Sequence, residues 1–295
     1  MTRTLITGNR GFVGTHLWRE LEEHGYDLCG HDQTDGDLTT PGVFAAHLED
    51  CEPDMVIHLA AQVGRIFGER DLAHTIESNA TMTALVAKAC GERGVPVLYA
   101  STSEAYGDWG DTLCFEGMVP RLPHNLYGLT KRFAEELLAL YAPENLKIVR
   151  LSMPAGPGAP PGVGRRALDT MLWQAHHQMP LCVHRGAERA WCHVADTVRG
   201  IRIVIEQGSA GVYNIGRDDN PVSMLALAEM CCDLADAPRE LIGEVDPPRM
   251  QTVVKRLSTR KLRELGWQPT RELPDILDDI YRWVQNFDRD GVYRP

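Results

Sequence analysis

The stretch ITGNRGFVG at residues 6–14 decides the fold of this chain. Its glycines follow a short apolar run and precede a segment with apolar residues at every fourth position. Gly8 permits a tight turn, Gly11 lets the backbone approach a pyrophosphate, and Gly14 allows a helix to pack closely on a strand. A helix that begins near Gly11 points its N–H groups at the phosphates. We therefore predict a strand, a glycine-rich turn and a helix that bind a dinucleotide.

An acidic residue lies about one βαβ unit further on. Asp32 follows a strand predicted at 26–31, where its carboxylate can accept hydrogen bonds from ribose hydroxyls and repels a 2′-phosphate. No Arg or Lys occurs between Arg19 and Arg65, which favours NAD over NADP, although Arg10 could reach such a phosphate. We predict NAD contacts from the turn and from the ends of the next two strands: Gly8, Gly11, Phe12, Val13, Gly14, Asp32, Asp37, Leu38, Leu59, Ala60 and Ala61.

Strands and helices alternate through the first half of the chain. Apolar runs predict strands at 4–7, 26–31, 54–60, 95–101 and 146–152, and longer periodic segments predict helices at 75–93 and 126–141. This alternation predicts the α/β class, as a doubly wound parallel sheet of the Rossmann type.

The composition and patterning of the sequence change after residue 152. The run 153–164 is rich in Pro and Gly and is not expected to form regular structure. We place an NAD-binding Rossmann domain at 1–152 and a smaller C-terminal α/β substrate-binding domain at 153–295. Residues of about 189–207 are expected to return to the first domain.

Composition excludes several classes of function. The net charge of −11 and the absence of a basic run argue against a nucleic-acid partner. No apolar run reaches the roughly 18 residues that span a bilayer, and no signal-peptide pattern is present, so we expect a cytoplasmic protein without a membrane partner. The eight cysteines have no C-x-x-C spacing, so we expect reduced, buried thiols and no metal site.

Tyr127 and Lys131 lie one turn apart on one face of a predicted helix. A lysine ammonium beside a phenol is expected to lower the phenol pKa from about 10. The phenolate can then take a proton from a sugar hydroxyl as hydride leaves the carbon. Thr102, upstream in the chain, would hydrogen bond to the same oxygen. We therefore predict Thr102, Tyr127 and Lys131 as catalytic residues, with Tyr127 and Lys131 also contacting NAD.

The chain resembles the extended short-chain dehydrogenase/reductases, in the group of nucleotide-sugar epimerases and dehydratases. The resemblance covers nearly the whole length and rests on TGNRGFVG, HLAA at 58–61, ASTSEAYG at 100–107, YGLTK at 127–131, RAWCHVAD at 189–196 and LGWQP at 265–269. It implies an NAD domain, a nucleotide-sugar domain and a homodimer built through the helices at about 75–93 and 126–141. It also implies a reaction that begins by oxidising the sugar at C4 and then regenerates the cofactor.

The resemblance also suggests a role for Glu104. The order Thr-Ser-Glu at 102–104 resembles UDP-glucuronate decarboxylases and GDP-mannose 4,6-dehydratases, and it makes Glu104 a candidate base near C5 of the sugar. A 4-keto group acidifies the C5 hydrogen, so a carboxylate there could drive loss of water from C5–C6. If C6 is a carboxylate, the same keto group allows loss of CO2. Ser103 stands where dTDP-glucose dehydratases usually have Asp, which disfavours that activity.

Arginines are the predicted ligands of the substrate's diphosphate. Arg189 matches the family arginine that binds this group, Arg249 is a second candidate, and Arg65 and Ser103 are expected to face the sugar. The chain departs from the family at Met153, where many relatives have an Asn that contacts the substrate. Tyr127 is followed by Gly, as in dehydratases and epimerases, whereas decarboxylases commonly have an acidic residue there.

Four hypotheses follow. The leading one is a redox-neutral nucleotide-sugar lyase, a 4,6-dehydratase or a glucuronate decarboxylase, that works through a 4-keto sugar. The second is a 4-epimerase that uses only Thr102, Tyr127 and Lys131. The third is a net reductase or dehydrogenase that releases its cofactor. The fourth is a non-catalytic dinucleotide-sensing or RNA-binding relative, which the acidic composition and the retained Tyr and Lys disfavour.

Overall fold

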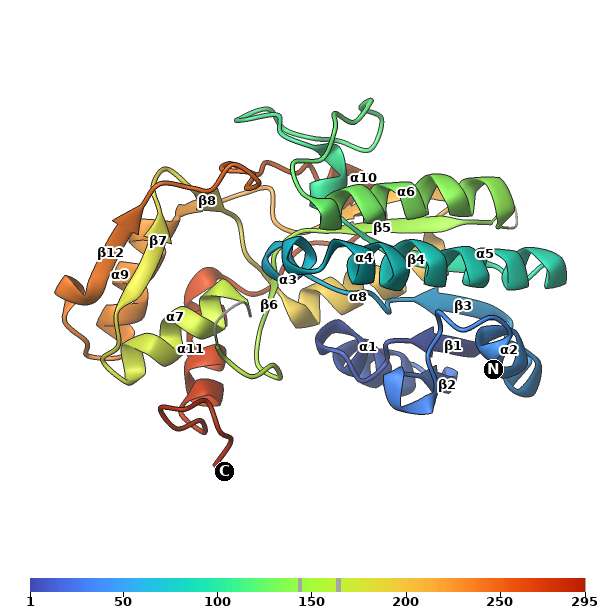
Figure 1. Cartoon of the computed structure of the whole chain (residues 1–295), viewed down its shortest axis with the longest axis horizontal. Helices are drawn as coiled ribbons and strands as arrows, with labels where there is room; N and C mark the ends of the chain where they lie inside the picture. Colours follow the sequence, from blue (N-terminus) through green and yellow to red (C-terminus); the bar gives the residue numbers. More distant parts are fainter. Residues whose placement is uncertain (143–144, 163–165, 295) are drawn as a thin grey trace.

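A computed structural model describes residues 1–142, 145–162 and 166–294, without the side chains of Arg65 and Phe67. Six parallel strands form the central sheet, in the order β10-β5-β4-β3-β1-β2 (Figure 1). Their bounds are β1 Arg3–Thr7, β2 Asp27–His31, β3 Met55–His58, β4 Val97–Thr102, β5 Lys147–Leu151 and β10 Gly211–Ile215. The predicted α/β class and doubly wound parallel sheet are confirmed.

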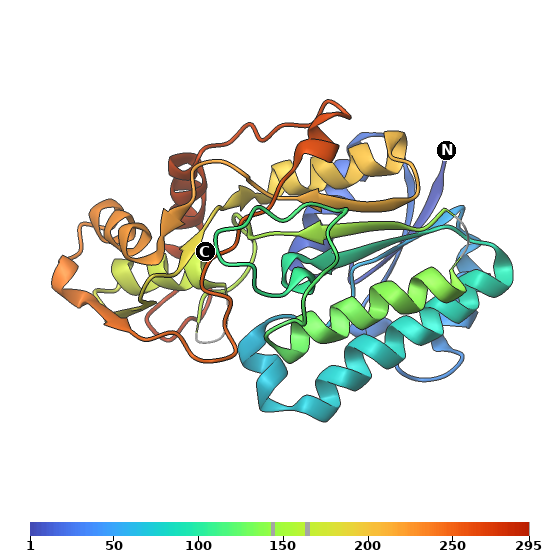
Figure 2. The ribbon, with the colours of Figure 1, turned by 90° about the horizontal axis from the view of Figure 1, so that it is seen from above.

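Helices cover both faces of the sheet because each strand is apolar on both sides. On one face α1 (Phe12–Glu23) and α8 (Val194–Gln207) share a core with residues such as Ile6 and Ile57. On the other face α2 (Val43–Cys51), α5 (Met82–Arg93) and α6 (Leu126–Tyr141) pack on the alternate residues, such as Leu5 and Val56. Figure 2 shows α8 on one side of the sheet and α5 and α6 on the other.

Short helices connect these elements near the carboxyl ends of the strands. They are η1 (Gln33–Asp35), α3 (Arg65–Arg70), α4 (Leu72–Ile76), the π-helical turn η2 (Glu77–Thr81), η3 (Ser103–Tyr106) and α10 (Arg260–Arg263). The single helix predicted at 75–93 is therefore wrong in detail. The end of α4, the π turn and α5 occupy that range, and the π turn places buried Asn79 against Thr130 of α6.

A smaller second region packs around its own core, to the left in Figure 1. Three two-stranded pairs contribute to it: β7 (Leu181–His184) with β12 (Ile242–Val245), β8 (Glu188–Arg189) with β11 (Val222–Ser223), and β6 (Pro154–Ala155) with β9 (Cys192–His193). Helices α7 (Ala167–His176), α9 (Met224–Leu234), α11 (Leu273–Val284) and the short η4 (Arg239–Leu241) complete it.

The chain returns to the sheet over a longer stretch than 189–207. After α8, strand β10 pairs with β5 at the edge of the sheet, although it lies in the range assigned from sequence to the second domain. Trp267 is buried in the core under α8, and its indole N–H donates to the carbonyl of Asp196 at 2.9 Å. Parts of the chain beyond residue 207 therefore stabilise the Rossmann sheet.

The expectation that all cysteines are reduced and buried is wrong for three of them. Cys29 of β2 and Cys51 of α2 form a disulfide, with Cα atoms 6.6 Å apart, and Cys182 is free but exposed. The other cysteines are free and buried. No local pattern marks the bonded pair, because its proximity follows from the packing of β2 beside α2. Among the described residues no helix is long and apolar enough to cross a membrane.

A buried ion pair ties α6 to two strands. Arg150 of β5 donates Nε and Nη2 to the two carboxylate oxygens of Glu135 on α6, at 2.9 and 2.6 Å, and the two side chains are only 5% and 6% exposed. Ser101 of β4 donates to the same carboxylate. A bidentate pair of this kind fixes both the distance and the orientation of the elements that carry it.

Removing one partner of this pair should destabilise the fold strongly. We expect Glu135→Ala to lower the free energy of unfolding by about 3–5 kcal/mol, because Arg150 would remain buried and unpaired. Urea unfolding followed by circular dichroism measures the change. The double variant Glu135→Leu/Arg150→Met should recover most of the loss, and a double variant no more stable than Glu135→Ala would contradict this account.

Candidate active site

The glycine-rich turn forms a close-packed cradle at the carboxyl edge of the sheet. Gly8 has φ +73°, and a Cβ there would lie 2.8 Å from the backbone nitrogen of Ala60. A Cβ on Gly14 would lie 2.1 Å from the carbonyl oxygen of Gly8. Gly11 is the N-cap of α1, and no side chain caps this helix. The backbone N–H groups at the start of α1 are therefore open to an anion, and the cradle fits a dinucleotide pyrophosphate.

Asp32 lies beside this cradle as the N-cap of η1. Its carboxylate accepts from the backbone N–H of Gln33 at 2.8 Å and of Arg10 at 3.2 Å. The Arg10 guanidinium pairs with Asp35 at 3.4 Å and also bonds Thr34. Arg10 is therefore engaged by η1, and the Asp32 carboxylate stands beside the cradle, where an acidic residue of a dinucleotide-binding turn is expected.

The other residues predicted to contact NAD are spread along the same edge. Leu59, Ala60 and Ala61 follow β3, and Ala60 N–H donates to the Thr7 hydroxyl at 3.3 Å. Asp37 is exposed and accepts from the backbone N–H and hydroxyl of Thr39 at 2.9 and 2.8 Å. Leu38 is 5% exposed and belongs to the core under α2.

Thr102, Tyr127 and Lys131 come together where β4 ends and α6 begins. Asn125 caps α6 by accepting from the N–H of Gly128 at 2.8 Å, which fixes Tyr127 in the first turn. The Thr102 hydroxyl lies near the Tyr127 phenol and favours its ionised form. The Lys131 ammonium lies 4.2 Å from the centre of the Tyr99 ring, and the side chain is almost fully buried.

The expected lowering of the phenol pKa does not occur in the chain by itself. Burial raises the pKa of Tyr127 above its usual range, and the neighbouring Thr102 hydroxyl opposes this only in part. Lys131 does not offset it, because its ammonium lies against Tyr99. Burial lowers the pKa of Lys131 to about 7, and the nearby Glu135 carboxylate opposes that shift. Both groups are therefore pushed toward their neutral forms.

Glu104 lies in η3, two residues beyond Thr102. Its carboxylate bonds the Lys255 ammonium and accepts from the Thr252 hydroxyl at 3.0 Å. Burial alone would raise the pKa of Glu104, but Lys255 and Thr252 outweigh it and hold the pKa below its usual value. A Cβ on residue 128 would lie 2.9 Å from the Cβ of Glu104, so Gly128 allows η3 to rest on α6.

Arg189 reaches the same place from β8. Its guanidinium donates to the backbone carbonyls of Glu188, Thr252 and Val253 at 2.6–2.7 Å. Burial lowers its pKa, while the nearby Glu104 carboxylate opposes this shift. In this structure Arg189 therefore fixes the segment that carries Thr252 and Lys255.

The other residues that were predicted to bind the substrate are Arg249, Arg65 and Ser103. Arg249 is exposed in a turn, and no partner for its side chain is found among the described residues. Arg65 begins α3, but its side chain lies outside the described part. Ser103 lines a small cavity with Lys255. Met153 has φ +48° and packs against the second core, so its side chain has a structural contact in place of the family Asn.

Lys255 and Thr252 were missed by the sequence prediction. They are about 150 residues from Glu104 in sequence, and no motif marks them. Only the path of the chain from the second region back across η3 brings them to the site. Among the described residues no cluster of three or more His, Cys, Asp or Glu side chains could hold a metal ion.

The fold and site define a class of nucleotide-binding enzyme, and comparison with known proteins assigns its family. Residues 4–216 match the NAD dependent epimerase/dehydratase family, so the chain belongs to this family. UDP-glucuronic acid decarboxylase 5 of Arabidopsis thaliana is 27% identical over 93% of this chain and 87% of that protein. The protein is therefore an enzyme of the NAD-dependent nucleotide-sugar epimerase/dehydratase type.

Solved structures agree in fold along the whole chain. The UDP-glucose 4-epimerase of Thermus thermophilus, in complex with NAD, matches with a TM-score of 0.88 at 19% identity, over 96% of this chain and 99% of that one. MoeE5 in complex with UDP-glucuronic acid and NAD matches with a TM-score of 0.84 at 25% identity, over the same shares. These likenesses confirm the Rossmann sheet with a smaller second region.

The glycine cradle gives a direct test. We expect Gly14→Ala to lower the melting temperature by at least about 3 °C and to weaken NAD binding, because its Cβ would overlap the carbonyl of Gly8. Differential scanning fluorimetry and calorimetric titration with NAD measure the two effects. Gly11→Ala is the matched control for the melting temperature alone, since its Cβ would lie 3.2 Å from the same oxygen, whereas NAD binding should weaken in both variants because both positions belong to the cradle. Equal losses of melting temperature in both variants would refute the cradle geometry.

Proposed function

We propose that the protein is an NAD-dependent, redox-neutral nucleotide-sugar lyase that works through a transient 4-keto sugar. The observation that carries this proposal is the placement of Glu104 two residues beyond Thr102, in contact with the helix that bears Tyr127 and Lys131. When bound, NAD supplies an acceptor for the electron pair that leaves C4 and returns it later in the cycle. The residues of the glycine cradle and Asp32 would hold it.

Tyr127 and Thr102 would hydrogen bond to the oxygen at C4 of the sugar. The two side chains lie near each other, so the phenol and the hydroxyl could both bond one sugar oxygen. Because burial keeps the phenol protonated in the chain alone, Tyr127 becomes a base only when the ligands change the electrostatics around it. Lys131 is the cation one turn away that can stabilise the phenolate.

Glu104 is the group that distinguishes a lyase from an epimerase. Its carboxylate is held ionised at the site, as a base for the C5 hydrogen must be. If C6 carries a hydroxyl, Glu104 takes the C5 proton of the 4-keto sugar and water leaves from C6. If C6 is a carboxylate, the C5–C6 bond breaks, its electron pair passes into the enolate of the 4-keto group as CO2 leaves, and C5 then takes up a proton from water. A 4-epimerase needs no such base.

A 4-epimerase is the second candidate, and one observation favours it. Glu104 is already engaged by Lys255 and Thr252, so its carboxylate could serve only to join η3 to the second region. Arg249 lies in a turn from which it could reach the nucleotide in either case. Arg189, the predicted ligand of the diphosphate, would bind that group only after releasing the backbone carbonyls that it holds in this structure.

Substitution of Glu104 separates the two candidates. We expect Glu104→Gln to keep NAD affinity while lowering turnover by about 10²–10⁴-fold, because the base is lost. Mass spectrometry of products from a panel of UDP-, GDP-, dTDP- and CDP-hexoses and hexuronates measures the reaction. The wild type should release water or CO2 from one member of this panel.

Two further variants make this test decisive. Glu136→Gln on the exposed side of α6 is the matched control and should keep full turnover. Tyr127→Phe should abolish every reaction of the panel. A product of unchanged mass whose formation is insensitive to Glu104→Gln would establish the epimerase instead.

We also propose a homodimer built through α4, α5 and α6. Large apolar side chains are exposed on two of these helices: Leu72 and Ile76 on α4, and Leu129, Phe133, Leu140 and Tyr141 on α6. An exposed row of this kind is a typical contact between copies of a chain.

A charge placed in this row should separate the copies. We expect Phe133→Glu to shift the protein from dimer to monomer in sedimentation-velocity experiments. Leu225→Glu on α9 introduces the same charge at an exposed apolar position of the second region and should leave the dimer intact. A wild-type monomer, or equal dissociation by both variants, would contradict the proposed interface.

A further inference from the structure

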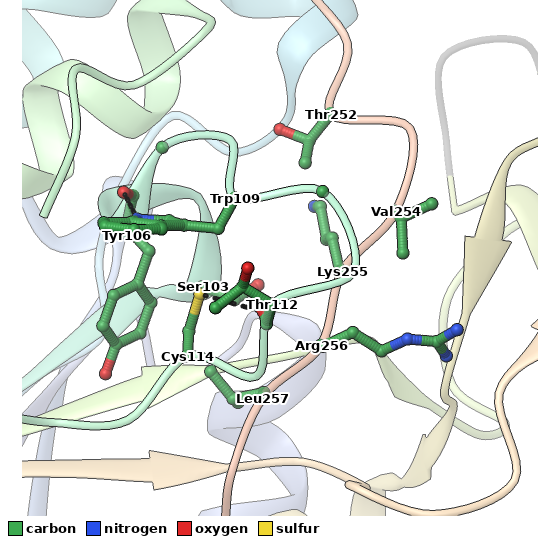
Figure 3. A pocket seen from close by; sticks show the side chains of 12 residues that line it. Ser103, Tyr106, Trp109, Thr112, Cys114, Thr252, Val254, Lys255, Arg256 and Leu257 are labelled. Carbon is green, nitrogen blue, oxygen red and sulfur yellow. Dashed lines mark hydrogen bonds between the residues drawn. The ribbon is translucent and has the colours of Figure 1, made fainter. Parts of the chain in front are cut away.

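A segment of the second region crosses directly over η3. Residues 252–257, the crossing segment, are fixed by the guanidinium of Arg189 and by backbone bridges between Glu188 and Val254 and between Cys114 and Leu257. Together with the loop after η3, the crossing segment lines a cavity of about 20 Å³, room for about one water (Figure 3). The segment is therefore held close to Glu104 from both ends.

Lys255 is the charged residue of this segment that bonds to Glu104, beside the hydroxyl of Thr252. An ammonium group has three N–H donors. In the described part of the chain, the Glu104 carboxylate is the one acceptor found for Lys255. Two donors of a largely buried ammonium are therefore left for another acceptor.

The charges around Glu104 do not balance. Two cations, Lys255 and Arg189, face the one carboxylate, and the other partners of Arg189 are neutral backbone carbonyls. Burial lowers the pKa of both cations and Glu104 opposes this for each, while the nearby Arg189 lowers the pKa of Lys255 further. A buried excess of one positive charge is costly, so a bound anion would relieve it.

The cluster lies where the C6 substituent of a bound sugar is expected. In the proposed function Thr102 and Tyr127 bind the oxygen at C4. Glu104 follows Thr102 by two residues, on the side of the crossing segment. C6 is two bonds from C4 in a hexose. We propose that Lys255 is a specificity-determining residue that pairs with an acidic group at C6, so that the site takes a nucleoside diphosphate hexuronate in preference to the corresponding hexose. This inference rests on the proposed nucleotide-sugar function.

Equilibrium binding tests the proposal without relying on turnover. Calorimetric titrations of the NAD-loaded full chain use UDP-glucuronic acid, UDP-glucose and UDP, and in parallel GDP-mannuronic acid, GDP-mannose and GDP. For the matching nucleotide we expect the wild type to bind the hexuronate at least about tenfold more tightly than the hexose. Lys255→Gln should bring this ratio close to one, and Lys255→Arg should keep most of it.

Substitution of the carboxylate should act in the opposite direction. Glu104→Gln removes the one negative charge of the cluster, so the hexuronate preference should increase by about threefold or more. Arg256→Gln is the matched control, because Arg256 neighbours Lys255 but pairs with Glu188 at 2.9 Å and points away from Lys255 (Figure 3). It should leave the ratio unchanged.

Three results would overturn the proposal. If Lys255→Gln weakens UDP or GDP as much as the hexuronate, Lys255 binds the diphosphate. If the ratio of hexuronate to hexose affinity is unchanged in both Lys255→Gln and Glu104→Gln, the cluster does not recognise the C6 substituent. If no nucleotide sugar binds the wild type while NAD does, the proposed function itself fails, and this inference fails with it.

Discussion

The bidentate ion pair between Glu135 and Arg150 is the interaction on which the geometry of the site depends. It joins α6 to β5, and Ser101 joins the same carboxylate to β4. Thr102 follows Ser101, and Lys131 lies one turn before Glu135, so each of these predicted catalytic side chains is next to a member of this network. Because the pair is buried, it has one favourable arrangement, and the distance between β4 and α6 is fixed with it.

Burial divides the site into two electrostatic halves. Around Tyr127 and Lys131 burial raises the pKa of the phenol and lowers that of the ammonium to about 7, so it favours the neutral form of each. Around Glu104 the Lys255 ammonium outweighs burial and holds the pKa of the carboxyl below its usual value. In the proposed mechanism the first pair acts at C4 of the sugar, and Glu104 with Lys255 lies on the side of C5 and C6.

Local patterns were sufficient to predict most of the fold. The helix predicted at 126–141 occupies Leu126–Tyr141, because a good N-cap and a regular apolar period define it without reference to the rest of the chain. The glycine-rich turn was equally clear, since its close contacts involve backbone atoms that only glycine leaves free.

Long-range packing explains what these patterns did not reveal. The place of β10 beside β5 depends on a crossover, and the contact between Lys255 and Glu104 joins residues 151 positions apart. The pKa of Tyr127 was predicted in the wrong direction because the spacing shows that a lysine is one turn away but not that its ammonium lies against Tyr99.

A redox-neutral cycle requires that the electron pair removed at C4 be returned to the sugar before the product leaves. Incubation with a nucleotide sugar that carries deuterium at C4, followed by mass spectrometry and NMR of the product, tests this requirement most directly. We predict that the deuterium stays in the product, at C4 after loss of CO2 or at C6 after loss of water, with no accumulation of reduced cofactor. Release of the deuterium in free NADH, in step with an oxidised sugar, would contradict the proposed cycle.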